Sequence, residues 1–388
     1  MELKRVIVMV VLLLLGGARV AHAQSPEMAA GKKVDAIFSA VSSPDSPGFA
    51  VLVRKDGQTI FERGYSLRDL RTKTKIDAQT NFRLASFTKQ FTAMAIMLLV
   101  HDGKLRYDET LAEIFPDFPT YGKTITVRNL LNHTSGLPDY EDLMDAAEKV
   151  KGPTWTRERQ IQDDEVLELL KKEKAGKFAP GTSWSYSNSG YVVLGLIAAK
   201  VSGKSYGEFL HQRIVAPLTM NHTIVFQKGK NAVANRAFGH TKEKDVFKET
   251  DQSSTSATLG DGGIYSNLED LAKWDDALRN HTLLTEKEMQ PALTPAKLAD
   301  GSEPHWPKEP NDDNLAPGKP VSYGFGWFLD PYKGHRRMWH SGSTVGFYTI
   351  IERFIDERLT VIILSNRTDW DREKVAQQVA DIFLLPKN

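Results

Sequence analysis

The 388-residue sequence predicts an α+β fold of the α/β-sandwich type, in which helices flank an antiparallel β-sheet and a mainly helical lobe is inserted between the strands. Two observations support this fold class. Runs typical of β-strands occur near both ends of the chain, and the segment between them has helical periodicity. We therefore expect a single domain, residues 24–388, with a sheet lobe at about 30–85 and 321–388 and a helical lobe at about 86–320.

The chain begins with a pattern typical of a secretory signal peptide. Lys4 and Arg5 precede ten apolar residues, 6–15, and Ala21-His22-Ala23 supplies a small-residue cleavage site. Ten apolar residues are fewer than the roughly 20 that a membrane-spanning helix needs. We expect cleavage after Ala23 and a periplasmic or secreted protein without a stable membrane anchor. Because the chain has no cysteine, disulfides and a lipid-modified cysteine are excluded.

The charge balance gives no indication of a nucleic-acid or anionic-membrane partner. The whole chain has 50 Lys and Arg residues against 49 Asp and Glu residues. Removal of residues 1–23, which include Lys4, Arg5, Arg19 and Glu2, leaves 47 against 48. A chain of this length can bury a large core. The partner that we expect, a small-molecule or peptide substrate, is indicated by the candidate site residues below and not by the charge. The oligomeric state is open.

The two ends of the chain supply the predicted sheet and its flanking helices. A helix is expected around 34–41, followed by two strands joined across Asp56-Gly57 in the manner of a tight hairpin. Residues 338–366 contain three β-rich runs, and residues 371–384 have the pattern of an amphipathic helix. We expect the strands of both ends to share one antiparallel sheet.

The middle of the chain, residues 86–290, is mostly helical in pattern. Examples are TVRNLLNH, DDEVLELLKKEK and SGYVVLGLIAAKVSG, the last with Gly203 where a helix would stop. Residues 295–320 hold six prolines and few apolar residues. This stretch is either a plain surface loop or the rim of a substrate site.

A serine and a lysine stand at the start of the most apolar helical segment. Ser86 and Lys89 are three residues apart, so both side chains project from the same side of the first helical turn. A serine hydroxyl becomes a nucleophile when a neighbouring base takes its proton, and a lysine that burial has partly desolvated can serve as that base. The spacing alone is weak evidence, because such pairs also arise by chance.

A second candidate is the loop PGTSWSYSNSGY, which presents Tyr186 and Asn188 just before an apolar helix. A tyrosine beside a lysine can act as a base, and an asparagine can hold the pair by hydrogen bonds. The alternative is a simple helix-capping loop. The triplet Tyr265-Ser266-Asn267 repeats the pattern, so the pattern alone does not identify a site.

A third candidate is WHSGSTVGF, residues 339–347, on an expected strand. Gly342 would let a backbone or a ligand approach closely, and the N–H of Ser343 could form an oxyanion hole with the N–H of Ser86. His340 would then border the cleft. The alternative is a strand bend with a structural histidine.

Motifs of several other enzyme classes are missing. The chain has no G-x-S-x-G, H-E-x-x-H or G-x-x-x-x-G-K-[ST] motif, and the nine histidines of the mature chain show no ligand-like clustering. We therefore expect no metal site and no cofactor.

The three candidate motifs occur in a fixed order: S-x-x-K first, Y-x-N about 100 residues later, and H-x-G about 150 residues after that. This order resembles the serine β-lactamase and penicillin-binding protein superfamily. The Y-S-N and H-S-G forms are most similar to its class C branch, which also holds D,D-peptidases, esterases and D-amino-acid peptidases. Roughly residues 34–385 share the resemblance, which implies a β-lactamase/transpeptidase-like fold. The supporting segments are TITVRNLLNHTSGLPDY, FAPGTSWSYSNSGY, GDGGIYSNLEDLAKW and YGFGWFLD.

The resemblance implies a role for each candidate. Ser86 would be the nucleophile, Lys89 and Tyr186 a coupled proton-handling pair, and Asn188 an orienter of Lys89 and of the substrate amide. The backbone N–H groups of Ser86 and Ser343 would form the oxyanion hole. The implied reaction is cleavage of an amide or ester through an acyl-enzyme.

The sequence departs from the class C pattern at His340. Efficient class C β-lactamases usually have a lysine there, and that cation helps hold the β-lactam carboxylate, whereas histidine is mostly neutral near pH 7. The resemblance therefore implies a D,D-peptidase, an esterase or a weak β-lactamase. The alternative is a non-catalytic penicillin- or peptide-binding sensor domain on the same fold.

Overall fold

The computed structural model describes residues 26–308 and 316–386. The predicted signal peptide, 1–23, lies outside these residues. Within the described ranges, no helix is both long and apolar enough to cross a membrane.

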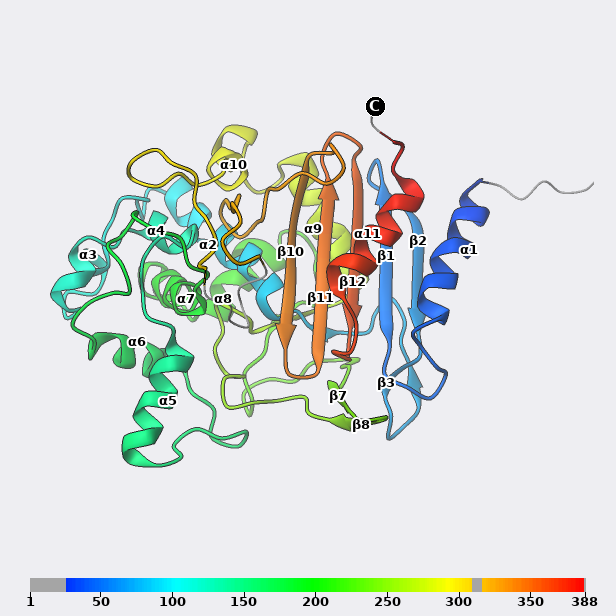
Figure 1. Ribbon diagram of the computed structural model, residues 1–388, viewed down its shortest axis with the longest axis horizontal. Helices are drawn as coiled ribbons and strands as arrows, with labels where there is room; N and C mark the ends of the chain where they lie inside the picture. The colour runs from blue at the N-terminus through cyan, green and yellow to red at the C-terminus, as the bar shows by residue number, and fades with distance from the viewer. Residues whose placement is uncertain (1–25, 309–315, 387–388) are drawn as a thin grey trace, which may run out of the picture.

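Strands from both ends of the chain form one five-stranded antiparallel sheet, as the sequence predicts (Figure 1). Its order is β10-β11-β12-β1-β2, so β10 is an edge strand. The strands are β1 (Phe49–Lys55), β2 (Gln58–Tyr65), β10 (Arg337–Thr344), β11 (Phe347–Phe354) and β12 (Leu359–Ser365). The β1–β12 pairing, with Val51 opposite Ile363, joins the two ends. Asp56 and Gly57 both have positive φ, which matches the tight hairpin expected there.

Helices α1 (Pro26–Ser39) and α11 (Arg372–Phe383) pack together on one face of this sheet (Figure 1). Val34 and Phe38 of α1 are fully buried against it. The helix begins eight residues before the predicted start at residue 34, because apolar periodicity starts only there.

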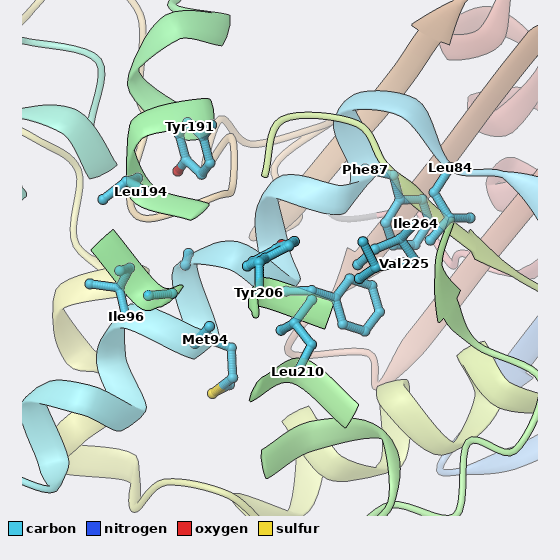
Figure 2. Packing of buried hydrophobic residues seen from close by; sticks show 14 of the residues in the cluster. Leu84, Phe87, Met94, Ile96, Tyr191, Leu194, Tyr206, Leu210, Val225 and Ile264 are labelled. Carbon is cyan, nitrogen blue, oxygen red and sulfur yellow. The ribbon is translucent and has the colours of Figure 1, made fainter. Parts of the chain in front are cut away.

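Most of the remaining helices lie beside the β10 edge of the sheet, where α2 packs against α7 and α8, whereas α9 lies behind the sheet and contacts β1 (Figure 1). Residues 89–99 of α2 are all buried, as its apolar sequence from Phe91 to Leu99, with only Thr92 polar, indicates. Figure 2 shows Met94 and Ile96 of α2 packed near Tyr206 and Leu194. The helices are α2 (Lys89–His101), α3 (Leu111–Ile114), α4 (Val127–Leu131), α5 (Tyr140–Lys151), α6 (Asp163–Lys171), α7 (Asn188–Ser202), α8 (Tyr206–Leu210), α9 (Leu268–Asn280) and α10 (Glu286–Leu293), with shorter turns η1 (Ala85–Thr88), η2 (Thr120–Lys123) and η3 (His211–Val215).

Outside the five-stranded sheet, the chain also forms short strands that were not predicted from the sequence. They form three small sheets, β3-β4, β5-β9-β6 and β7-β8. Two to four residues give too little alternation to reveal a strand in the sequence. Their bounds are β3 (Leu67–Asp69), β4 (Thr74–Lys75), β5 (Phe82–Arg83), β6 (Ile224–Val225), β7 (His240–Glu243), β8 (Val246–Glu249) and β9 (Ile264–Ser266).

Candidate active site

Ser86 and Lys89 lie side by side, but not in one continuous α-helix. Ser86 belongs to the 3-10 turn η1, and α2 begins only at Lys89. The sequence predicts both residues in the first turn of one helix, and that detail is wrong. Nζ of Lys89 nevertheless donates a hydrogen bond to Oγ of Ser86 at 3.1 Å, because three residues of a tight turn still bring both side chains to one side.

Hydrogen bonds to two strands, β9 and β11, hold the residue that precedes the Ser86 turn. The N–H of Leu84 donates to the carbonyl of Ile264 at 2.8 Å, and Oγ1 of Thr349 donates to the carbonyl of Leu84 at 2.8 Å. Figure 2 shows Leu84 and Phe87 beside Ile264. Ala85 has φ +51°, in the left-handed region that costs a non-glycine residue about 1–2 kcal/mol. The surrounding strands thus fix Ser86 in one orientation.

Gly342 allows β10 to come close to this turn. A Cβ atom at position 342 would lie 2.0 Å from the carbonyl oxygen of Leu84 and 2.3 Å from Oγ1 of Thr349. Only glycine fits between them. The close approach places the exposed Ser343, next along β10, at the same cavity as Ser86.

Lys89 is completely buried and is surrounded by acceptors. Besides Ser86, its Nζ donates to Oδ1 of Asn188 at 2.8 Å and to the carbonyl of Asp261 at 3.2 Å. These hydrogen bonds offset the cost of burying the polar amine of Lys89. The Nζ atom also lies 4.8 Å from the ring centroid of Tyr186.

The loop before α7 both caps that helix and presents Tyr186. Oγ of Ser187 accepts a hydrogen bond from the N–H of Gly190 at 3.0 Å, as an N-cap does, and Asn188 is the first residue of α7. The capping interpretation and the functional one are therefore both compatible with the geometry.

The second Tyr-Ser-Asn triplet, residues 265–267, lies outside this cluster. Tyr265 is on β9, is 1% exposed, and its OH accepts a hydrogen bond from Arg236 at 3.0 Å. Asn267 caps α9. Neither side chain takes part in the Ser86–Lys89 cluster described above.

His340 is buried and neutral. Its Nδ1–H donates to the carbonyl of Ser341 at 2.7 Å, and its Nε2 accepts from the OH of Tyr323 at 3.1 Å. Burial, reinforced by the positive charge of Lys89, lowers the pKa of His340 to about 3. The residue therefore brings no cation to the site at pH 7.

A cavity of about 480 Å³ opens in front of Ser86. The predicted residues Ser86, Tyr186, Asn188, His340 and Ser343 line it, and the buried Lys89 and Gly342 lie behind its wall. Trp306 lines it as well, so the proline-rich stretch 295–320 supplies part of the rim rather than a plain loop.

Several residues of this cavity were not predicted from the sequence. Arg372, the first residue of α11, lines it, with its guanidinium 4.2 Å from the ring centroid of Tyr348. Asp261 lines it too and offers its carbonyl to Lys89. The quoted GDGGIYS segment contained Asp261, but no local pattern indicated Arg372. In the described ranges, no three or more His, Cys, Asp or Glu side chains are grouped as a metal would require.

Comparisons with known proteins identify the family. The family described as beta-lactamase matches residues 34–383. The chain belongs to the beta-lactamase family. Penicillin-binding protein 4* of Bacillus subtilis (strain 168) is 30% identical over 371 residues, which are 91% of this chain and 76% of that protein. A D-aminopeptidase of Cereibacter sphaeroides is 28% identical over 82% of this chain, which spans only 57% of that protein's length.

Solved structures agree with this family. The octameric penicillin-binding protein homologue from Pyrococcus abyssi is 26% identical with a TM-score of 0.74, over 92% of this chain and 78% of that one. The D-amino acid amidase from Ochrobactrum anthropi SV3 also gives a TM-score of 0.74, over 92% and 99%, but at 22% identity it supports the fold alone. This beta-lactamase-family chain is thus a serine hydrolase with an acyl-enzyme mechanism.

Proposed function

We propose that this beta-lactamase-family protein is an exported hydrolase that cleaves an amide or ester bond of a small D-amino-acid peptide or derivative, with Ser86 as nucleophile. The observation that supports it most is the contact of 3.1 Å between Nζ of Lys89 and Oγ of Ser86 at the wall of the cavity. A buried lysine beside a serine hydroxyl is the arrangement that activates the serine.

In the proposed mechanism, Oγ of Ser86 attacks the substrate carbonyl carbon while the coupled pair of Lys89 and Tyr186 takes the hydroxyl proton. The backbone N–H groups of Ser86 and Ser343 would stabilise the oxyanion. Collapse of the tetrahedral intermediate breaks the bond to the leaving amine or alcohol, which receives the proton. Water then attacks the acyl carbonyl carbon, the bond to Oγ of Ser86 breaks, and the carboxylic acid leaves. The Lys89 and Tyr186 pair takes the proton of the water and returns it to Oγ. Asn188 keeps the amine of Lys89 in place throughout.

The charges of the cavity support a small substrate with polar ends. Glu141 and Asp261 line it from the helical part, and Arg372 lines it from α11. Groups of both signs favour a molecule that bears both an ammonium and a carboxylate. Because His340 is neutral, β-lactams would be poor substrates. The name of the D-aminopeptidase relative supports D-configured substrates.

Export rests on the proposed signal peptide alone. The test is the N-terminal sequence of the protein recovered from the periplasm or the medium of a bacterial host. The proposal expects it to start at Gln24. A full-length protein confined to the cytosol would contradict it.

The test of the catalytic proposal compares Ser86→Ala with the unmodified protein on D-alanine p-nitroanilide, a peptide ending in D-Ala-D-Ala, p-nitrophenyl butyrate and a chromogenic cephalosporin. We expect at least one amide or ester of this set to turn over, and Ser86→Ala to lose at least about 10⁴-fold in kcat. Ser254→Ala, which removes another cavity-lining hydroxyl, is the matched control and should stay within a few-fold. Equal losses in both variants, or a wild-type protein that only forms a permanent adduct, would contradict the proposal.

A further inference from the structure

His133 lies behind the catalytic cavity in a segment to which the proposed mechanism gives no role. It follows α4, is completely buried, and has φ +63°. A buried histidine in the left-handed region is unusual, because the backbone is strained and the ring needs hydrogen-bond partners. Hydrogen bonds and ring contacts with the neighbouring segment hold His133 in this conformation.

His133 binds the backbone on both sides of Tyr186. Its carbonyl oxygen accepts a hydrogen bond from the N–H of Ser185 at 3.0 Å, and its Nδ1 accepts one from the N–H of Ser187 at 3.1 Å. Ser185 and Ser187 flank Tyr186, so these two hydrogen bonds restrict the φ and ψ angles of Tyr186. The backbone of Tyr186 is thereby fixed from one side.

The imidazole also packs on the Tyr186 ring. The two ring centroids are 4.5 Å apart, and further contacts of 4.6 Å to Tyr323 and 5.2 Å to Tyr191 hold the imidazole from other directions. Tyr323 in turn donates to His340. One rigid aromatic cluster therefore supports the tyrosine that faces Lys89.

The protonation state of His133 agrees with this geometry. Nδ1 accepts an N–H bond, so it must be unprotonated, and burial together with the charge of Lys89 keeps the pKa of His133 well below 6.5. The remaining Nε2 has no hydrogen-bond partner among the described residues. Since its exposure is zero, His133 does not touch the substrate.

We propose that His133 is a positioning residue, which fixes Tyr186 opposite Lys89 by accepting hydrogen bonds from Ser185 and Ser187 and by packing on the tyrosine ring. This inference rests on the proposed role of Tyr186 in proton transfer. A tyrosine released from its support would place its hydroxyl wrongly, and an error of 1 Å in such a group can cost about 100-fold in rate.

Two substitutions separate the acceptor from the backbone conformation. In His133→Asn, Oδ1 takes the position of Nδ1, and asparagine tolerates a positive φ. In His133→Gly, the backbone is equally free but the acceptor and the ring are lost. We expect His133→Asn to keep kcat within about 10-fold and His133→Gly to lose about 100-fold in kcat with KM nearly unchanged. Thr134→Ala removes hydrogen bonds with Asn129 and Asn132 in the same segment but none with Ser185, Tyr186 or Ser187, so it is the control and should retain activity.

The deciding experiment repeats His133→Gly in a Tyr186→Phe background, with thermal melting to establish that each variant is folded. If His133 acts through Tyr186, the substitution should cost little in kcat once the hydroxyl is gone. An equal loss in both backgrounds, or no loss in either, would overturn the inference. If His133→Gly does not fold, His133→Gln replaces it, because its amide lies near the position of Nε2 and offers no acceptor at Nδ1.

The same experiment distinguishes failure of the underlying proposal. Full activity of Tyr186→Phe alone would refute the proposed role of Tyr186, and with it the basis of this inference. Loss of activity in Tyr186→Phe together with full activity of His133→Gly would refute only the inference about His133.

Discussion

The substitution Gly342→Ala tests whether the close approach of β10 to the Ser86 turn sets the geometry of the site. A Cβ atom there would meet the carbonyl oxygen of Leu84 at 2.0 Å, whereas ordinary contacts begin near 3.4 Å. The strand and the turn must therefore separate by about 1.4 Å. Such a shift moves the N–H of Ser343 away from Ser86 and strains the hydrogen bond between Thr349 and Leu84.

The expected effect is larger on catalysis than on stability. A displacement of about 1 Å can cost about 100-fold in rate, so kcat for the best ester substrate should fall by about that factor or more. Overpacking costs about 1–3 kcal/mol, which the large core can tolerate. Stopped-flow acylation kinetics give the rate, and urea unfolding gives the free energy of unfolding.

The matched control is Gly31→Ala in α1. Its added Cβ would lie 3.5 Å from the ring of Phe61, an ordinary contact. Alanine also favours a helix by about 0.5–1 kcal/mol over glycine, so this variant should be fully active and at least as stable. A fully active Gly342→Ala, with acylation unchanged, would refute the argument that this glycine positions the site.

Three further predictions follow from the contacts of the site. Lys89→Ala should lower the acylation rate by about 10²–10⁴-fold. Lys89→Arg should be similarly slow, because a guanidinium is a poor base. Pre-steady-state kinetics measure the acylation rate of both variants. Arg372→Ala should raise KM about 10-fold for substrates with a free carboxylate but not for neutral esters, and equal changes for both would contradict a carboxylate contact. His340 should destabilise the fold in acid. The pKa of His340 is about 3 in the folded protein and 6.5 in the unfolded chain. Between these values only the unfolded chain binds the proton, so the free energy of unfolding falls as the pH drops from 6.5 towards 3. At pH 5 this amounts to about 2 kcal/mol relative to pH 8, and His340→Gln should remove that part of the difference in urea unfolding.

Features with a strong local signal were predictable from the sequence. The Asp56-Gly57 hairpin, the burial of the apolar helix next to Ser86 and the Gly203 helix end were all expected, and the structure confirms them, although that helix begins at Lys89 and not before Ser86. Each depends on residues within one turn or one helix, so its physical cause can be read from adjacent positions.

Features that depend on distant segments were not predictable in the same way. The carbonyl of Asp261, 172 residues from Lys89, accepts one of its hydrogen bonds, and a backbone group leaves no trace in the residue type. Arg372 reaches the cavity only because α11 packs on the sheet beside β11. The resemblance indicated the segment that contains His133, but only the structure shows that its carbonyl and Nδ1 bind both neighbours of Tyr186.

The central claim is that Ser86 becomes acylated, and mass spectrometry of a quenched reaction tests it most directly. The mature protein would be mixed with a p-nitrophenyl ester, quenched in acid during the burst, digested and mapped. The account predicts an acyl group on the peptide that contains Ser86, and none there in Ser86→Ala, which should also lack the burst. Continued turnover by Ser86→Ala, or an acyl group found only on another residue during turnover, would contradict it.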